Sequence, residues 1–228
     1  GRVSPGDFIP IAERSSLINE IGRWVLLQAC GTLARWSRDP ALNDVRIAVN
    51  VAGSHLLDGD LVADLDATVG RTGADPKLLE FELTETQLVE DHQRAAAVLH
   101  ELRRRGPLVA IDDFGTGYSS MAYLRELPID ILKIDGSFVT PLASSDSETI
   151  VLDALVTIGH SLELAVVAEG IEHASQVDEL RLRGLDRLQG FHLARPMPVD
   201  EAELWLTIPP GWFEGPPTMR DAASTSRC

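Results

Sequence analysis

Two adjacent carboxylates stand where an apolar strand is expected to meet a glycine-containing loop, in the stretch Ala110-Ile111-Asp112-Asp113-Phe114-Gly115-Thr116-Gly117-Tyr118-Ser119-Ser120. The apolar run that ends at Ile111 predicts a buried strand, and the two glycines permit turns that residues with a side chain resist. Paired aspartates at such a place suit a metal site in outline. They are also common as turn residues and helix caps, so the pair alone leaves both interpretations open.

The rest of the chain alternates apolar runs with segments of helical spacing. The apolar runs predict six strands, at residues 46–51, 78–83, 108–112, 131–135, 164–169 and 185–189. The helical spacing predicts helices at residues 18–36, 58–71, 85–104, 118–126, 146–162 and 173–183. Strands that alternate with helices indicate parallel crossover connections, and therefore an α/β sheet or a (β/α)8 barrel.

Polar residues at the strand ends choose between these two architectures. Each predicted strand ends in at least one of them: Asn50, Glu82, Asp112, Lys133 with Asp135, Glu169, and Gln189. In a barrel these ends converge on one mouth, where active sites of this architecture lie, whereas an open sheet spreads them along an edge. One acidic strand end is most often a solvated cap, but a whole set in register favours a shared site.

The fold prediction is therefore a modified TIM (β/α)8 barrel. A closed barrel needs about eight strands, and only six are found, so we expect the first two strands to be absent from the chain. The predicted domain covers residues 1–208. Residues 209–228 are rich in proline, glycine, serine and threonine and predict a disordered C-terminal tail.

Composition excludes some functions and favours a compartment. The 228 residues carry 35 acidic and 20 basic side chains, a formal net charge of −15, which opposes binding to a nucleic acid polymer. Only two cysteines occur, which suits a reducing compartment. The sequence has no uninterrupted apolar segment of about 20 residues and no signal peptide, so the prediction is a cytoplasmic domain, although its parent protein could be membrane-anchored.

The motifs resemble those of the EAL family of cyclic di-GMP phosphodiesterases. The resemblance runs from residue 7 to about residue 206 in family order. It rests on residues 7–13, 21–26, 49–51, 80–85, 112–120, 127–135, 166–172, 189–191 and 195–198. It implies metal-dependent hydrolysis of cyclic di-GMP to the linear dinucleotide pGpG on a modified TIM barrel, with two Mg²⁺ or Mn²⁺ ions and with inhibition by Ca²⁺.

The resemblance also implies a set of metal ligands. Asn50, Glu82 and Asp112 resemble the ligands of a first metal ion, and Asp112 resembles a bridge to a second ion that Asp113 and Glu169 complete. Hard divalent cations prefer such oxygen ligands, and two of them can hold a hydroxide and neutralise charge on phosphoryl oxygens. Asn50 also has a plainer interpretation, as the cap of a strand end.

Further residues resemble supporting parts of the site. Lys133 resembles the residue that orients or deprotonates the attacking water, and we favour orientation because carboxylates around a lysine keep it charged. Glu172 resembles a ligand that acts through water, and Glu85 resembles the anchor of the glycine loop. Glu85 is equally well explained as an acidic residue in a first helical turn. Asp135 and Gln189 resemble substrate contacts, with the alternative that they satisfy polar groups of the barrel.

Departures from the family pattern limit what is expected of this chain. Gly136 and His173 replace a common arginine and a threonine, and the Glu-Ala-Leu signature, whose glutamate binds the first metal, is absent. We therefore expect a truncated domain with impaired activity. A non-catalytic cyclic di-GMP receptor or protein-interaction module is the alternative. The resemblance also implies a homodimer through the loop after Asp113 and the adjacent helices, and an upstream sensory or cyclase domain.

Overall fold

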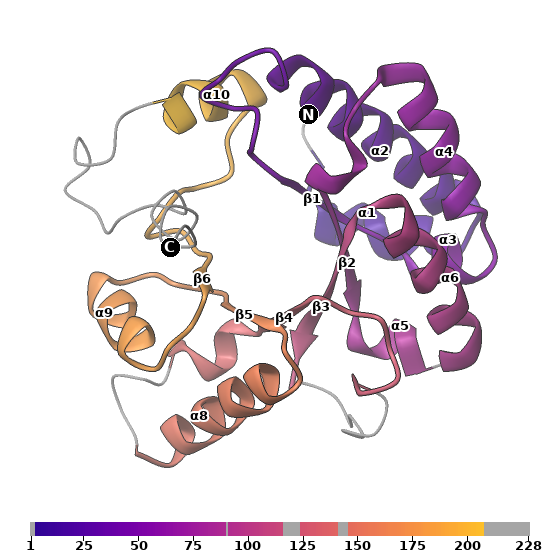
Figure 1. Cartoon of the computed structure of the whole chain (residues 1–228). Helices are drawn as coiled ribbons and strands as arrows, with labels where there is room; N and C mark the ends of the chain where they lie inside the picture. The colour runs from indigo at the N-terminus through magenta and orange to yellow at the C-terminus, as the bar shows by residue number, and fades with distance from the viewer. Residues whose placement is uncertain (1–2, 90, 116–123, 141–145, 208–228) are drawn as a thin grey trace. The chain divides into compact units, whose positions relative to one another are not determined.

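The computed structural model describes residues 3–89, 91–115, 124–140 and 146–207, and Figure 1 labels its helices and strands. The chain divides into two compact units. The first unit contains Gly1–Ile111 and Ser119–Ile129, and the second unit contains Asp112–Tyr118 and Asp130–Cys228. The boundary therefore falls inside one strand, directly before Asp112.

The strands follow the chain order in a six-stranded sheet, β1-β2-β3-β4-β5-β6. Their bounds are β1 Ile47–Asn50, β2 Leu79–Thr84, β3 Leu108–Phe114, β4 Ile131–Ile134, β5 Ala165–Ala168 and β6 Arg187–Leu188. Each strand pair whose register is described, β1 with β2, β4 with β5 and β5 with β6, is parallel. The six strands and the α/β class predicted from the sequence are confirmed, and β6 is shorter than expected.

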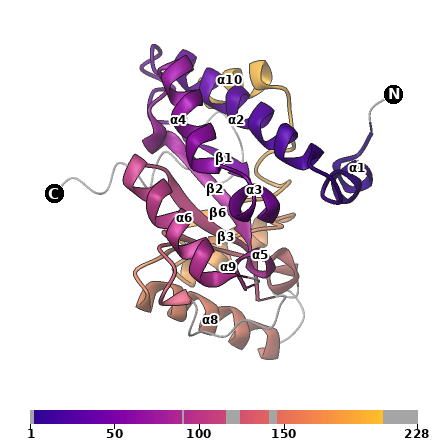
Figure 2. The same cartoon turned by 90° about the vertical axis from the view of Figure 1, so that its right-hand side faces the viewer.

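The first unit carries the helices α1 Pro5–Ala12, α2 Leu17–Trp36, α3 Gly53–Leu57, α4 Leu61–Thr72, α5 Glu85–Val89 and α6 His92–Arg105. Helices α2 and α4 lie side by side (Figure 2). The predicted helix 85–104 is wrong in its bounds, because that region holds two helices, α5 and α6, and the predicted helix 58–71 begins three residues too early. Side-chain caps set the starts of α4 and α6: Asp60 accepts a hydrogen bond from the N–H of Ala63, and Asp91 accepts one from that of Arg94.

The second unit carries a 3-10 turn, η2 Gly136–Phe138, and the helices α8 Asp146–Ser161, α9 Ala174–Leu182 and α10 Val199–Thr207. Its strands β4 and β5 are largely buried: Leu132, Ile134 and Val166 are fully inaccessible to solvent. Most of the predicted helix 118–126, most of the glycine loop and the predicted disordered tail 209–228 lie outside the described residues. Among the described helices, none combines the length and the apolar character needed to cross a membrane.

The loops that follow β4, β5 and β6 touch one another through their backbones. A β-carbon placed on Gly170, whose φ is +68°, would lie 2.8 Å from the Cα of Gly136. A β-carbon on Gly190 would lie 2.2 Å from the backbone N of Ile171. Real β-carbons do not approach backbone atoms this closely, so glycine is required at these positions. A β-carbon on Gly136, where the family pattern has an arginine, would lie 3.1 Å from the Cα of Gly170, a tight contact that a small shift could relieve.

Replacement of Gly190 by alanine is expected to destabilise the chain strongly. The added methyl group would clash with backbone atoms of Ile171, and no change of side-chain rotamer can relieve such a clash. Overpacking of this kind costs about 1–3 kcal/mol, and in a chain of this size that lowers the melting temperature by roughly 5 °C or more. Thermal unfolding followed by circular dichroism measures the effect.

Gly31→Ala is the matched control, because nothing lies within 4 Å of a β-carbon at that position in α2. It should stabilise the helix by about 0.5–1 kcal/mol. Equal melting temperatures for the two variants would show that the loops yield to the added methyl group.

Candidate metal centre

Asp112 and Asp113 lie near the carboxyl end of β3. Neighbouring side chains of a regular strand point to opposite faces, but Asp113 has a φ of 53°, in the left-handed region that aspartate tolerates better than most residues. Its backbone N–H donates to Oδ1 of Asp112 over 3.2 Å. The local turn therefore interrupts the alternation of the strand and places both carboxylates at one cluster.

Glu169 joins this pair from the loop after β5. Its backbone N–H donates to the carbonyl of Ile134 over 3.0 Å, which continues the pairing of β5 with β4 up to the glutamate. One carboxylate oxygen each from Asp112, Asp113 and Glu169 lies within 4.8 Å of the other two. The structure thus brings together three of the five predicted metal ligands.

Lys133 is buried against this cluster, with 3% of its side chain exposed. Its Nζ lies 3.0 Å from Oδ1 of Asp112 and 2.6 Å from Oε1 of Glu169. A buried ammonium group needs such partners, because its desolvation is otherwise costly. With all four groups ionised, three carboxylates face one ammonium, and negative charge remains in excess.

The pKa of Asp113 reflects burial first and this excess of negative charge second. It is raised above its ordinary value, first by burial and then by the charges of Asp112 and Asp135, while Lys133 opposes the shift. A site that raises a carboxyl pKa in this way favours the uptake of positive charge. The donors are hard carboxylate oxygens, which Mg²⁺ and Mn²⁺ prefer, and water can complete the coordination. The residues present therefore fit a divalent cation.

The other predicted site residues of the second unit lie on the loops that follow β4, β5 and β6. Asp135 follows β4, and its Oδ1 accepts from the backbone N–H of Ser137 over 3.0 Å. Hydrogen bonding from Ser137, first from its side chain and then from its backbone, lowers the pKa of Asp135. Glu172 is exposed on the loop after β5. Gln189 follows β6, and its backbone N–H donates to Ala168 over 2.8 Å. Their roles in catalysis and substrate binding stay predictions.

In the first unit, the structure brings together Asn50 and Glu82, which stand opposite each other in the register of β1 and β2. Glu82 is 7% exposed, and its carbonyl accepts the N–H of Val51 over 2.9 Å. Glu85 is the first residue of α5 and is also buried. Its role as the anchor of the glycine loop stays a prediction. The ligand roles of Asn50 and Glu82 stay predictions.

Two glutamines that hold site segments were missed by the sequence reasoning. Oε1 of Gln87 accepts the N–H of Thr84, the last residue of β2, over 3.1 Å. Oε1 of Gln176 likewise accepts the backbone N–H groups of Glu172 and His173, in the loop that follows Glu169. The available signal was a glutamine three residues after a helix-start position, the spacing of a capping box.

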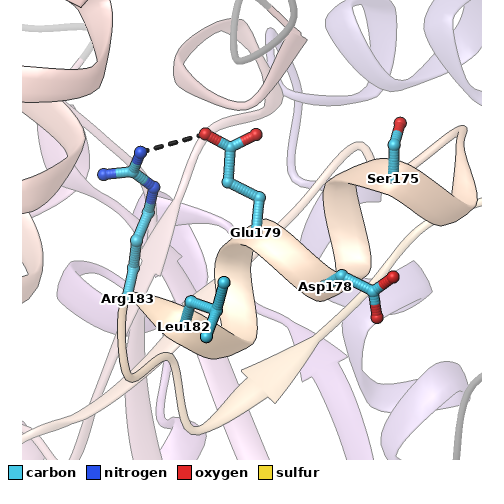
Figure 3. Close-up of a pocket in the computed structure, with 5 residues that line it drawn as sticks. All are labelled: Ser175, Asp178, Glu179, Leu182 and Arg183. Atoms are coloured by element: carbon cyan, nitrogen blue, oxygen red, sulfur yellow. Dashed lines mark hydrogen bonds and ion pairs between the residues drawn. The ribbon is translucent and has the colours of Figure 1, made fainter.

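A hollow on the surface of α9 contains none of the predicted site residues. Figure 3 shows its lining, which consists of Ser175, Asp178, Glu179, Leu182 and Arg183. Arg183 pairs with Glu179 over 3.0 Å and with Asp153 of α8. These contacts join two neighbouring helices, and we assign the hollow no part in the chemistry.

The comparison with protein families decides the identity of the fold. A model of the EAL domain matches residues 1–196. The chain belongs to the EAL family. Its members include cyclic di-GMP phosphodiesterases, as the names of the relatives below state. The resemblance found from the motifs is confirmed.

Similar proteins agree with this assignment. The chain is 39% identical over 201 residues to a bifunctional diguanylate cyclase/cyclic di-GMP phosphodiesterase, MucR of Pseudomonas aeruginosa, an alignment that covers 88% of this chain and 29% of MucR. The solved PaMucR phosphodiesterase in its c-di-GMP complex has a TM-score of 0.83 and 38% identity, covering 88% of this chain and 81% of that one. The EAL domain of Mycobacterium smegmatis DcpA has a TM-score of 0.78 and 33% identity, covering 85% and 88%.

The EAL chain spans only part of its curated relatives, about a quarter to a third of the length of those it matches. The likeness to solved EAL structures confirms the barrel-related α/β fold that the motifs implied.

Proposed function

We propose that the EAL chain hydrolyses one phosphodiester bond of cyclic di-GMP and releases linear pGpG, with two Mg²⁺ or Mn²⁺ ions. The observation that carries the proposal is the cluster of Asp112, Asp113 and Glu169 around the buried Lys133. The named activity of MucR and the solved PaMucR complex with c-di-GMP support the choice of substrate.

The carboxylates and Asn50 are proposed to bind the metal ions, and Lys133 is proposed to act on the water and the developing charge. By family position, Asn50, Glu82 and Asp112 hold the first ion, and Asp112, Asp113 and Glu169 hold the second. Bound divalent cations supply an activated water and neutralise charge that builds up on the phosphoryl oxygens. Lys133 is held by two ion pairs, and a cation fixed in this way stabilises developing negative charge without reorganising during the reaction. It therefore orients the attacking water and stabilises charge, and it need not accept a proton.

The remaining predicted residues act at the margin of the cluster. Asp135 and Gln189 contact the substrate, and Glu172 supports metal binding through water. Glu85 anchors the loop that follows Asp113. The 228 residues contain no Glu-Ala-Leu tripeptide, and we propose that these residues alone turn over cyclic di-GMP more slowly than a chain that includes this motif.

A hydrolysis assay tests the proposal. Purified chain is incubated with cyclic di-GMP and Mg²⁺ or Mn²⁺, and the product is identified by mass spectrometry. We expect pGpG with either ion, none after chelation, and little when Ca²⁺ replaces them. Asp200→Asn, an exposed substitution in α10 outside the cluster, is the matched control and should leave turnover unchanged.

The same experiment separates the enzyme from a non-catalytic receptor. Calorimetric binding of cyclic di-GMP in Ca²⁺, without turnover in Mg²⁺ or Mn²⁺ by this chain or by a chain that includes the Glu-Ala-Leu motif, would identify a receptor and contradict the proposal. A homodimer through the loop after Asp113, an upstream sensory or cyclase module and a cytoplasmic location stay predictions.

A further inference from the structure

We propose that Gln176 is a positioning residue for the metal cluster: its side-chain amide fixes the loop that carries Glu169 and Glu172. The inference deepens the proposed function and rests on its metal-binding part. Gln176 belongs to α9 and is 6% exposed. It touches none of the cluster carboxylates in any contact that the structure describes, so its effect is transmitted through the backbone.

The amide of Gln176 makes three hydrogen bonds. Its Oε1 accepts from the backbone N–H of Glu172 over 2.9 Å and from that of His173 over 2.8 Å. Its Nε2 donates to the carbonyl of Val139 over 3.3 Å. The residue therefore uses both ends of its amide, and it connects the loop after β5 to the segment after β4.

Hydrogen bonds hold both ends of the loop after β5. At its start, the N–H of Glu169 is bonded to the carbonyl of Ile134, as in a continuing strand. At its end, Gln176 holds Glu172 and His173. Between them, Gly170 packs against Gly136 at a distance that excludes a β-carbon. The carboxylate of Glu169 thus projects from a short segment with little freedom to move.

Helix capping alone does not account for these contacts. In a capping box the side chain at this position bonds one backbone N–H, that of the N-cap residue, which here is His173. Gln176 bonds a second N–H on the preceding residue, and its nitrogen reaches Val139, 37 positions away in the chain. The opposite side of α9 carries the exposed residues of Figure 3, among them Ser175 and Asp178.

Loss of the amide should loosen the Glu169 loop and weaken metal binding. Outer-shell residues of metal sites typically change affinity by about 10–100-fold when removed. We expect Gln176→Ala to raise the Kd for Mn²⁺ roughly tenfold. Gln176→Glu keeps an acceptor for the two N–H groups but turns a carboxylate oxygen toward the carbonyl of Val139, so its loss should be smaller, about threefold.

Calorimetric titration with Mn²⁺ alone tests this on the full chain, with thermal unfolding in chelator as a second readout. Asp60→Ala is the matched control, because it removes an exposed helix-cap bond in the first unit, from the backbone N–H of Ala63 to Oδ1 of Asp60, without touching the cluster. It should lower the melting temperature and leave the Kd unchanged. If Gln176→Ala does not fold, the Kd of Gln176→Glu for Mn²⁺, compared with that of wild type, provides the test.

The outcomes distinguish the inference from the proposed function. A lowered melting temperature with an unchanged Kd in the Gln176 variants overturns the positioning role and leaves the enzyme proposal standing. Weakened Mn²⁺ binding in a chain that never hydrolyses cyclic di-GMP supports the positioning role and removes the enzyme proposal. A wild-type chain that binds no Mn²⁺ overturns both.

Discussion

Replacing Asp112 by asparagine is expected to reduce cyclic di-GMP turnover by about a thousandfold or more, which corresponds to roughly 4 kcal/mol of lost transition-state stabilisation. Asparagine keeps the shape of the side chain but removes the charge that faces Lys133 at 3.0 Å and one carboxylate of the cluster. The same change should raise the Kd for Mn²⁺, because the proposed bridging ligand loses its charge.

Initial rates at saturating Mn²⁺, measured beside calorimetric titration, separate the two effects. Asp200→Asn repeats the same chemical change away from the cluster and should behave as wild type. Turnover of Asp112→Asn within a factor of ten of wild type would show that the cluster is not where the chemistry occurs.

Replacing Lys133 by methionine should destabilise the metal-free chain and make its stability depend on metal. Methionine keeps the length of the side chain but removes the ammonium that neutralises Asp112 and Glu169. Removing one partner of a buried ion pair costs about 3–5 kcal/mol, which lowers the melting temperature of a chain of this size by roughly 10 °C. Turnover should also be lost, because no fixed cation remains beside the reacting water.

Metal should reverse part of this loss. A divalent cation neutralises the same carboxylates, so Mn²⁺ should raise the melting temperature of Lys133→Met by more than it raises that of wild type. Thermal unfolding with and without Mn²⁺ measures the difference. Lys77→Met is the matched control, because Lys77 lies in a short 3-10 turn of the first unit. An equal Mn²⁺ effect in Lys133→Met and wild type would contradict the charge balance described for the cluster.

The strands could be predicted from the sequence because their burial leaves a direct mark on it. Leu79 to Leu83 and Ile131 to Ile134 are buried throughout. Their apolar residues stand out from the surrounding sequence, although Glu80, Glu82 and Lys133 interrupt them. Helix ends were predicted less well. The caps at Asp60 and Asp91 each rest on one hydrogen bond that an apolar pattern does not record.

The members of the carboxylate cluster could also be predicted, since a whole set of polar residues at the ends of parallel strands favours a shared site. Asp112, Asp113, Lys133 and Glu169 were all named from the sequence, and the structure groups them. The grouping follows from parallel strands, whose carboxyl ends share one edge of the sheet.

The sequence by itself determined the order of strands and helices, the family and the residue types at the strand ends, because burial and local spacing act on neighbours in the chain. Only the tertiary structure decided how these residues meet. The left-handed turn at Asp113, the contact of Gly136 with Gly170 and the bond from Gln176 to Val139 depend on segments that lie far apart in the chain or on one dihedral angle. Contacts of this kind are set by packing in three dimensions, and no periodicity in the sequence encodes them.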